Sequence, residues 1–363
     1  MNQTNRNVPG TIPVRPGEEF DTAIVKQYLS EHVPDLPDEP LEVVQFPSGA
    51  SNLTYLLRIG EWQAVMRRPP LGPLPPKAHD MKRESEFLKL LNPVFPLAPK
   101  PHVFCEDAAL IGTPFYVMEY RTGVVLDGKF PESVHPTPET CQNISYAVAD
   151  TLAQLHQVSI ESSGLSAFGH PQGFMERQVK GWIERYQRAK TDDVPTIDPI
   201  ASWLVEKLPA SPPATVIHND FKLNNMLLSS DLSKVDTVVD WEMATIGDPL
   251  MDLAIALGYW VEPDDPASLK QMLPAVTTVD GFLSRADMLQ RYAVKSGRDV
   301  SNMDFYMVFA YFKLSVILQQ IYVRWRRGQT QDPRFEHFGK RVNELVAHAQ
   351  RLIDGQPWSN KLK

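Results

Sequence analysis

Short segments in which apolar and polar residues alternate dominate the first third of the chain. Such alternation places every second side chain on one face of a sheet and is typical of half-buried strands. The predicted strands cover Glu42–Phe46, Leu53–Ile59, Trp62–Arg67, His102–Cys105 and Pro114–Glu119. Helical spacing of apolar residues appears in two further segments of this part, Phe20–Leu29 and Lys77–Leu91.

Beyond residue 130 the apolar residues recur every three or four positions, which predicts helices. The predicted helices cover Pro138–His156, Gly173–Lys190, Val279–Ser296, Phe305–Arg327 and Arg334–Ile353, and another starts at Asp248-Pro249. Asp248 fits an N-cap, because its side chain can accept from the free N–H groups of a first turn. We expect a structural role for Asp252 as well. The C-terminal part is therefore predicted to be helical apart from one strand–loop–strand segment.

These patterns predict an α+β fold, with a small lobe built on a five-stranded antiparallel sheet and a larger helical lobe. A chain of 363 residues is longer than one hydrophobic core usually grows, which also favours two parts. We expect an arm and a helix over residues 1–40, an N-terminal lobe over 41–120 and a C-terminal lobe over 121–363. The polar, glycine-containing segment Tyr120–Gly128 is typical of a hinge.

The strand–loop–strand segment carries the strongest chemical signal. After the apolar residues Val216 and Ile217 come Asp220, Lys222 and Asn225, and Asp240 follows at the end of a later strand. Phosphoryl transfer needs one carboxylate to orient a hydroxyl and accept its proton, and an amide and a second carboxylate for Mg²⁺. It also needs a cation for the charge that develops on the phosphate. The segment supplies this set, so a kinase-type site is our working hypothesis.

A second signal is the carboxylate of Glu84, which falls on the apolar stripe of the helix that contains Met81 and Leu88. A buried carboxylate without a cationic partner costs several kcal/mol, so we expect a partner. The sequence offers Arg67 and Arg68 at the end of the third predicted strand.

The turn Pro47–Asn52 joins two predicted strands and consists of small residues. Such a turn can direct backbone N–H groups toward a phosphate, but its composition also fits an ordinary hairpin. The chain has no G-x-x-x-x-G-K-[ST] motif, so a Walker-type phosphate loop is not predicted.

The net charge of −8 argues against non-specific binding of nucleic acid. Two cysteines cannot form a disulfide framework, and Met1–Gly17 contains no apolar core, so we expect no signal peptide and a cytoplasmic location. The apolar segment Phe305–Val323 raises the question of a membrane span. Because Lys313, Gln319 and other polar residues interrupt it, we predict a core helix and no membrane.

With these residues in view, the chain resembles the aminoglycoside phosphotransferase/choline kinase group of protein-kinase-like enzymes. It is most similar to the kinase-like domain that precedes some acyl-CoA dehydrogenases and also occurs as a stand-alone bacterial protein. The similarity rests on Phe46–Tyr55, Val65–Pro70, Gly112–Tyr120, the segment from Val216 to Leu228, and Asp240–Glu242 through Gly247–Pro249 to Asp252–Leu253. The resemblance implies a two-lobe protein-kinase-like fold.

The resemblance also implies roles for single residues. Asp220 and Lys222 would be catalytic, Asn225 and Asp240 would hold Mg²⁺, and His218 would support the loop. ATP would be bound by Ser51, Asn52, Arg67, Glu84, Met118, Glu119 and Arg121. The acceptor would be the hydroxyl of a small molecule, either a hydroxyacyl compound or CoA thioester, or an aminoglycoside-like or amino-alcohol compound.

Two alternatives stay open. Arg67 occupies the place of the lysine usual in kinases, so the chain could be a nucleotide-binding pseudokinase that regulates or accompanies a partner. His218 and Asp220 could instead be two ligands of a non-haem iron triad, although that chemistry is more typical of β-barrels. The oligomeric state and the choice between ATP and GTP are not fixed by the sequence.

Overall fold

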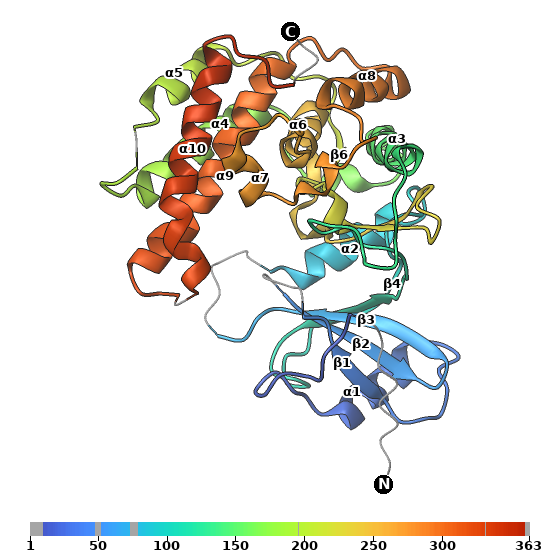
Figure 1. The fold of residues 1–363 in the computed structure, drawn as a ribbon. Helices are drawn as coiled ribbons and strands as arrows, with labels where there is room; N and C mark the ends of the chain where they lie inside the picture. Colours follow the sequence, from blue (N-terminus) through green and yellow to red (C-terminus); the bar gives the residue numbers. More distant parts are fainter. Residues whose placement is uncertain (1–9, 48–51, 73–78, 195, 331, 360–363) are drawn as a thin grey trace. The chain divides into compact units, whose positions relative to one another are not determined.

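The computed structural model describes residues 10–47, 52–72, 79–194, 196–330 and 332–359 of the 363-residue chain. These residues divide into two compact units (Figure 1). The first unit contains the residues up to Thr122 together with Thr237–Glu242, and the second contains Gly123–Asp236 and Met243 onward. The segment Thr237–Glu242, which carries Asp240, thus belongs to the sheet unit and not to the helical one.

The first unit is built on a five-stranded antiparallel sheet with the order β1-β2-β3-β5-β4. Its elements are α1 (Thr22–His32), β1 (Glu42–Gln45), β2 (Leu53–Ile59), β3 (Trp62–Arg68), α2 (Met81–Leu91), β4 (Pro101–Cys105) and β5 (Phe115–Glu119). Alternate residues of β2, such as Tyr55 and Leu57, are buried in one cluster with Val25 and Leu29 of α1. Helix α2 packs against β4 and β5 on the opposite face of the sheet (Figure 1).

The second unit is mostly helical and contains two short two-stranded sheets. Its helices are α3 (Pro138–Leu155), α4 (Phe174–Ala189), α5 (Asp198–Glu206), α6 (Pro249–Tyr259), α7 (Ala267–Met272), α8 (Arg285–Ser296), α9 (Met303–Arg326) and α10 (Phe338–Ile353). Its short strands are β6 (Thr215–Ile217), β7 (Met226–Leu228), β8 (Val235–Val238) and β9 (Thr245–Gly247). The sheet and the helical unit together confirm the predicted α+β class, with a five-stranded antiparallel sheet and a larger helical part.

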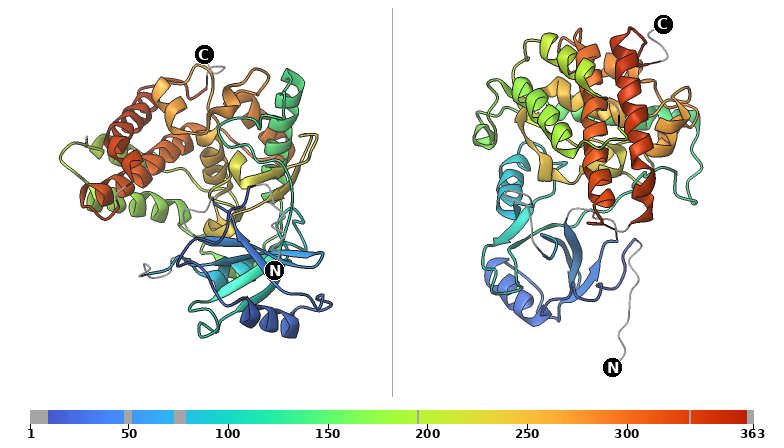
Figure 2. Two further views of the ribbon diagram at one scale, coloured as in Figure 1. Left: turned by 60° about the horizontal axis from the view of Figure 1, so that its bottom comes forward. Right: turned by 90° about the vertical axis from the view of Figure 1, so that its left-hand side faces the viewer.

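Helix α9 lies at the centre of the second unit. It packs against α4, α6 and α10, and the views in Figure 2 show α9 and α10 side by side. Among the described residues, α9 is the one helix whose length and apolar composition would allow it to cross a membrane, yet most of it is buried inside this unit. The fold therefore uses its apolar surface for packing between helices.

Several predicted helix starts were wrong, and at two of them a capping side chain, rather than apolar spacing, sets the first residue. Helix α2 begins at Met81, after the N-cap Asp80, and Lys77 lies outside the described residues. Helix α8 begins at Arg285 and not at Val279, because Ser284 and Asp287 form a capping box. The last helix begins at Phe338, after a 3₁₀ turn over Pro333–His337, and not at Arg334. The predictions also missed α5, α7 and β9.

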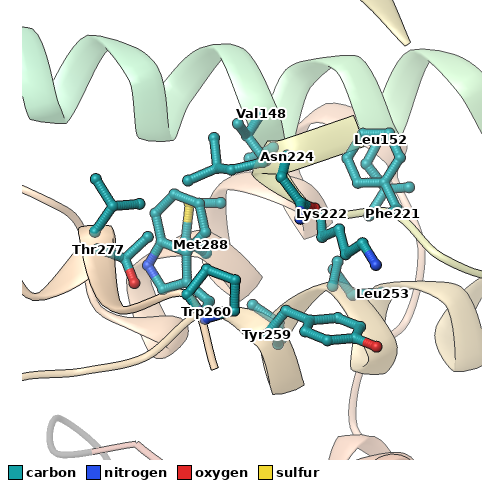
Figure 3. Close-up of a pocket in the computed structure, with 16 residues that line it drawn as sticks. Val148, Leu152, Phe221, Lys222, Asn224, Leu253, Tyr259, Trp260, Thr277 and Met288 are labelled. Atoms are coloured by element: carbon teal, nitrogen blue, oxygen red, sulfur yellow. The ribbon is translucent and has the colours of Figure 1, made fainter. Parts of the chain in front are cut away.

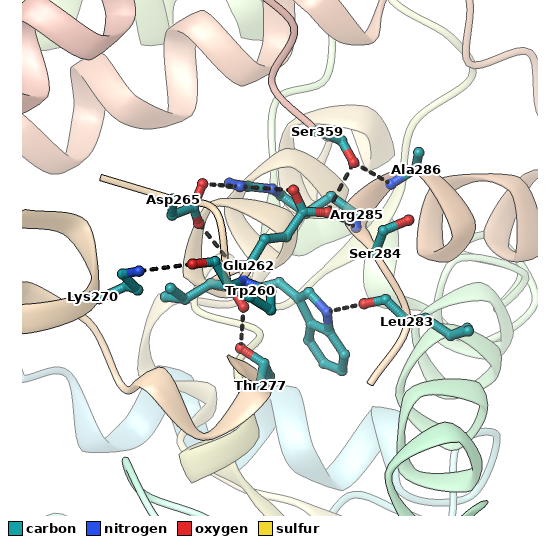
Figure 4. Close-up of polar contacts among 12 residues, drawn as sticks. Trp260, Glu262, Asp265, Lys270, Thr277, Leu283, Ser284, Arg285, Ala286 and Ser359 are labelled. Carbon is teal, nitrogen blue, oxygen red and sulfur yellow. Dashed lines mark hydrogen bonds and ion pairs between the residues drawn. The ribbon is translucent and has the colours of Figure 1, made fainter. Parts of the chain in front are cut away.

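A buried polar cluster ties α8 and α9 to the end of the described chain (Figure 4). Arg285 is only 2% exposed, and its guanidinium donates to the hydroxyl of Tyr311 at 2.5 Å and to the carboxylates of Glu262 and Asp265. The hydroxyl of Ser359 donates to Glu262 at 2.8 Å. Because the buried cation faces two carboxylates, its desolvation is offset by close pairing.

His348 packs beside this cluster and gives the fold a dependence on pH. Its ring meets the ring of Tyr311 edge-on at 4.5 Å, and its Nδ1 accepts from Arg351 at 3.3 Å. Burial, together with the positive charges of Arg351 and Arg285, lowers the pKa of His348 to about 4. The neutral ring therefore contributes stability above the unfolded pKa of about 6.5, and this contribution is lost as the pH falls toward the folded pKa.

We predict that the wild-type free energy of unfolding falls by about 3 kcal/mol more than that of His348→Gln between neutral pH and the folded pKa of His348. The physical reason is that only the wild type must keep an imidazole neutral inside the folded protein. Urea unfolding across this pH range measures the difference. Parallel pH profiles for the two proteins would contradict the prediction.

Candidate active site

Short strands anchor both ends of the loop that carries Asp220. Before the loop, β6 is buried and pairs antiparallel with β9. After the loop, β7 pairs with β8, and Leu228 and Val124 exchange backbone hydrogen bonds of 2.8 and 2.9 Å. The path of the loop is therefore fixed at its two ends by backbone pairing.

A buried carboxylate on α6 fixes the start of the loop. Asp252 accepts from the backbone N–H groups of His218 at 2.7 Å and Asn219 at 2.6 Å, and its Oδ2 lies 3.2 Å from Nε2 of His156. Burial alone would raise the pKa of Asp252, but the bonds from His156 and His218 outweigh it and lower the pKa below its usual value. The ionised carboxylate thus holds two consecutive N–H groups in one orientation.

Asn219 turns the chain at this point. Its φ is +69°, a left-handed conformation that asparagine tolerates better than most residues. Its side-chain oxygen accepts from the ammonium of Lys313 at 2.7 Å, and its amide nitrogen lies 3.4 Å from the carbonyl of Met243. These contacts tie the turn to α9 as well as to α6.

Asp220 follows the turn, and its carboxylate is held on one side only. The amide nitrogen of Asn225 donates to Oδ2 at 3.0 Å and to the backbone carbonyl of Asp220 at 2.9 Å. The ammonium of Lys222 lies 2.9 Å from the same Oδ2, and the N–H of Asp220 donates to Nδ1 of His218 at 3.3 Å. Oδ1 receives no hydrogen bond from any described residue, so this oxygen can accept one from a bound hydroxyl.

The side-chain amide of Asn225 presents its nitrogen to Asp220. Because its nitrogen donates to Asp220, the amide oxygen points away from that carboxylate and remains available. Amide and carboxylate oxygens are the ligands that Mg²⁺ prefers. The amide oxygen of Asn225 is therefore a donor of the kind that suits this ion.

Asp240 lies in the first unit and also has a left-handed backbone, with φ of +69°. Its Oδ1 accepts from Arg67 at 2.9 Å, whereas Oδ2 has no hydrogen-bond partner among the described residues. The next residue, Trp241, donates from its indole to the carbonyl of Val238 at 2.8 Å and packs near Phe87 and Phe95. A buried aromatic anchor thus holds the strained turn in place.

The partner of Glu84 is Arg67, one of the two arginines that the sequence offered. The two side chains form a close ion pair and are both buried. Arg68 instead donates to the hydroxyl of Tyr55 and the carbonyl of Glu18. Burial pulls the pKa of Arg67 down, but the facing carboxylates outweigh this effect and leave the pKa above its ordinary value. Burial raises the pKa of Glu84, and the charge of Arg67 opposes that shift.

The other residues predicted to bind nucleotide also belong to the first unit. Asn52 donates to Glu242 at 2.6 Å and its oxygen lies 2.9 Å from Nδ1 of His79. Ser51 lies outside the described residues. Met118 is buried at the end of β5, and the N–H of Glu119 donates to the carbonyl of Lys100. The side chains of Glu119 and Arg121 pair with each other at 2.9 Å. Glu119 also accepts from the N–H of Lys100, and Arg121 donates to the carbonyl of Pro96, each at 3.3 Å.

The structure adds residues that the sequence did not single out. Asp220, Lys222 and Asn219 line a chamber of about 320 Å³ together with Trp182, Tyr259 and other residues of α6 and α9. Lys313 also lines it. The only signal for Lys313 in the sequence was its place within an apolar run, which we used solely to argue against a membrane span.

A second cavity lies behind the loop and is lined by apolar side chains such as Leu152, Phe221 and Met288 (Figure 3). Its volume is about 30 Å³, which is room for a water molecule and not for a substrate. The stem of Lys222 lies over it, and the Lys222 ammonium is 5.1 Å from the centre of the Tyr259 ring. This cavity therefore belongs to the packing beneath the loop.

Among the residues that the structure describes, the iron alternative finds no third ligand. Within the described ranges, no group of three or more His, Cys, Asp and Glu side chains is placed to hold a metal ion. His218 is fully buried, and its Nδ1 already accepts from the backbone of Asp220. Its geometry is that of a support for the loop.

Comparison with known proteins places these features in a family. Residues 42–282 match the model of the family described as "Phosphotransferase enzyme family". The chain is 34% identical to acyl-CoA dehydrogenase family member 11 from Gallus gallus over 355 residues, which are 95% of this chain and 45% of that protein. The chain thus spans less than half the length of the first curated relatives it matches.

Solved structures agree with this assignment. A protein from Ralstonia eutropha JMP134, named as a candidate aminoglycoside phosphotransferase, matches with a TM-score of 0.80 and 26% identity, over 93% of this chain and 99% of that one. An aminoglycoside phosphotransferase in ternary complex with AMP-PNP and hygromycin B matches with a TM-score of 0.58 and 15% identity, over 92% and 99% of the two chains, and shows the fold alone. The match over 42–282 decides the question: the chain belongs to the phosphotransferase enzyme family.

Proposed function

We propose that this protein transfers the γ-phosphoryl group of ATP to a hydroxyl of a small molecule and requires Mg²⁺. The observation that carries the proposal is the arrangement at Asp220. Asn225 and Lys222 engage one carboxylate oxygen, and the other remains available to a bound hydroxyl. Family membership adds to this support, and a structural relative is named in complex with AMP-PNP.

In the proposed reaction Oδ1 of Asp220 accepts the hydrogen bond of the acceptor hydroxyl and takes its proton as the new O–P bond forms. The bond between the γ-phosphorus and its bridging oxygen breaks, and ADP leaves. Lys222, held beside Asp220 at 2.9 Å, would offset negative charge on the transferring group. Asn225 and Asp240 would hold Mg²⁺, which when bound neutralises charge on the phosphate oxygens.

The nucleotide would bind at the first unit. Arg67, fixed by Glu84 and next to Asp240, would contact phosphate oxygens through its planar fork. Asn52, with Ser51, would lie over the phosphates, and the segment Met118–Arg121 would meet the base. The pseudokinase alternative rested on Arg67 replacing lysine, and the pairing of Arg67 with Glu84 weighs against it.

The relatives suggest two acceptor classes. Those named as acyl-CoA dehydrogenase family members suggest a hydroxyacyl compound or a CoA thioester. A structural relative bound to hygromycin B suggests an aminoglycoside-like or amino-alcohol compound. A cytoplasmic location agrees with either class.

We predict that Asp220→Ala lowers the rate of acceptor phosphorylation by about 10²–10⁴-fold, because the hydroxyl loses its proton acceptor. Binding of ATP should change little, since Asp220 lies in the second unit and the proposed nucleotide residues lie in the first. Initial rates and equilibrium binding measure the two effects. Asp38→Ala, at an exposed position of the sheet unit, is the control. Turnover that survives in Asp220→Ala would remove the proposed role of Asp220.

We also predict slow hydrolysis of ATP in the absence of acceptor, and we expect Asp240→Asn to raise the Mg²⁺ concentration needed for half-maximal rate by at least about tenfold. The reason is that the substitution removes a charged oxygen ligand. Asp236→Asn is the matched control, because Asp236 pairs with Lys234 at the surface. Equal Mg²⁺ requirements in Asp240→Asn and wild type, or hydrolysis that needs no Mg²⁺, would refute this assignment. Absence of any hydrolysis and transfer would favour the pseudokinase.

A further inference from the structure

The chamber beside Asp220 has the size of a ligand site and mostly apolar walls. Its volume of about 320 Å³ lies at the lower end of the range for small-molecule pockets, roughly 300–1,000 Å³. The walls are formed by aromatic and aliphatic side chains of three helices, among them Trp182 of α4, Ile255 of α6 and Leu314 of α9. Such walls fit an acceptor with an apolar body.

The charges in this lining are unevenly distributed. Asp220 is the one carboxylate among the lining residues that the structure describes, and Lys222 already pairs with it at 2.9 Å. The remaining charged group is Lys313. A polycationic acceptor would find a single, already paired carboxylate here, together with a cation that repels it.

Lys313 is a buried cation that pairs with no carboxylate of the described residues. Its side chain is 5% exposed, and no carboxylate in the described part of the chain lies within 4.0 Å of its ammonium. The ammonium donates to Asn219 at 2.7 Å and lies 5.5 Å from the centre of the Trp182 ring. An ammonium has three donors, and only this one acceptor is found among the described residues.

Burial without pairing disfavours the charged form of a lysine. Burial lowers the pKa of Lys313 to about 8, even though the more distant carboxylates of Asp252 and Asp220 act in the opposite direction. A purely structural contact to Asn219 could be made by a neutral side chain without this desolvation. A buried ammonium with donors left over fits an anionic partner that the described residues do not supply.

A second cation lies close by. The guanidinium of Arg185 stacks at 4.7 Å from the centre of the Trp182 ring, and its charge also lowers the pKa of Lys313, after the effect of burial. Trp182 thus borders the chamber while two cations lie near its ring. The field at this end of the chamber favours negative charge.

We propose that Lys313 selects the acceptor by binding an anionic oxygen, of a carboxylate or of a phosphate ester, on a molecule whose apolar body fills the chamber and whose hydroxyl reaches Asp220. This inference rests on the proposed phosphotransfer at Asp220 and narrows its acceptor to hydroxylated, apolar anions. Lys313 binds and orients the acceptor and takes no part in proton transfer. Aminoglycoside-like and amino-alcohol acceptors are excluded by the same cation.

The test measures binding in the absence of nucleotide, with probes that share one carbon chain of six to ten atoms and a terminal hydroxyl. The other end carries a carboxylate, a phosphate monoester, a primary amide or an amine. At neutral pH we expect the wild type to bind one or both anions at least about tenfold more tightly than the amide, and the amine most weakly. The carboxylate and phosphate arms distinguish the two sources of the anionic oxygen.

Three variants distinguish selection of the anion by Lys313 from a purely structural role of this side chain. Lys313→Met should bind the anion and the amide equally, whereas Lys313→Arg should keep the preference for the anion because it keeps the charge. Lys340→Met, at an exposed position of α10, should behave as the wild type does. Thermal unfolding checks that each variant is folded, and the selectivity of the wild type tests the proposal even if Lys313→Met does not fold.

Equal binding of anion, amide and amine by the wild type, no binding of any probe, or a preference for the anion that persists in Lys313→Met would overturn the proposal. Failure of the proposed function looks different. If anion binding depends on Lys313 but no bound probe is phosphorylated, the proposed phosphotransfer is wrong and the anion-binding site at Lys313 stands. If the amine probe is phosphorylated as fast as the anionic probes, the proposed phosphotransfer is supported and the selective role of Lys313 is contradicted.

Discussion

The ionised carboxylate of Asp252 is the constraint on which the candidate active site depends. It is fully buried, and a buried charge is tolerated only when hydrogen bonds replace its lost hydration. The loop satisfies it by directing two consecutive N–H groups, those of His218 and Asn219, toward it. His156 completes the shell, and His156 is held in turn by the hydroxyl of Tyr292 at 2.7 Å. The shape of the loop follows from where this carboxylate sits on α6.

The functional geometry continues from that constraint. Once Asn219 is fixed in a left-handed conformation between α6 and α9, Asp220 is placed at the chamber and within reach of Asn225 and Lys222. The first unit uses the same device at Asp240, where a left-handed aspartate is followed by the buried Trp241. In both places local strain is held by packed neighbours, which is typical of functional sites.

Prediction from sequence succeeded where the signal was local. The alternating segments gave all five strands of the sheet to within one residue at each end, because register and burial follow a period of two. The position of Glu84 on an apolar stripe predicted that its carboxylate has an arginine partner, although the sequence could not choose between Arg67 and Arg68. The two neighbours point to opposite faces of β3, and only the paired structure shows which face meets α2.

Prediction failed where the partner is distant in the chain. Asp252 binds backbone groups 33 and 34 positions earlier, and such contacts leave no periodic pattern. Lys313 looked like an interruption in an apolar helix, and its meaning appeared only when Asn219, 94 positions earlier, was placed against it. The start of α8 was missed for another reason, because the capping box of Ser284 and Asp287 sets it, and the prediction rested on apolar spacing alone.

Amide hydrogen exchange in the variant Asp252→Asn tests most directly whether the carboxylate of Asp252 fixes the loop. This variant keeps the size of the side chain and removes its charge. We predict that the amides of the loop from His218 to Asn225 exchange at least about tenfold faster than in wild type, while those of β2 and β3 keep their protection. Unchanged exchange in the loop would show that its geometry does not depend on this carboxylate and would contradict the account.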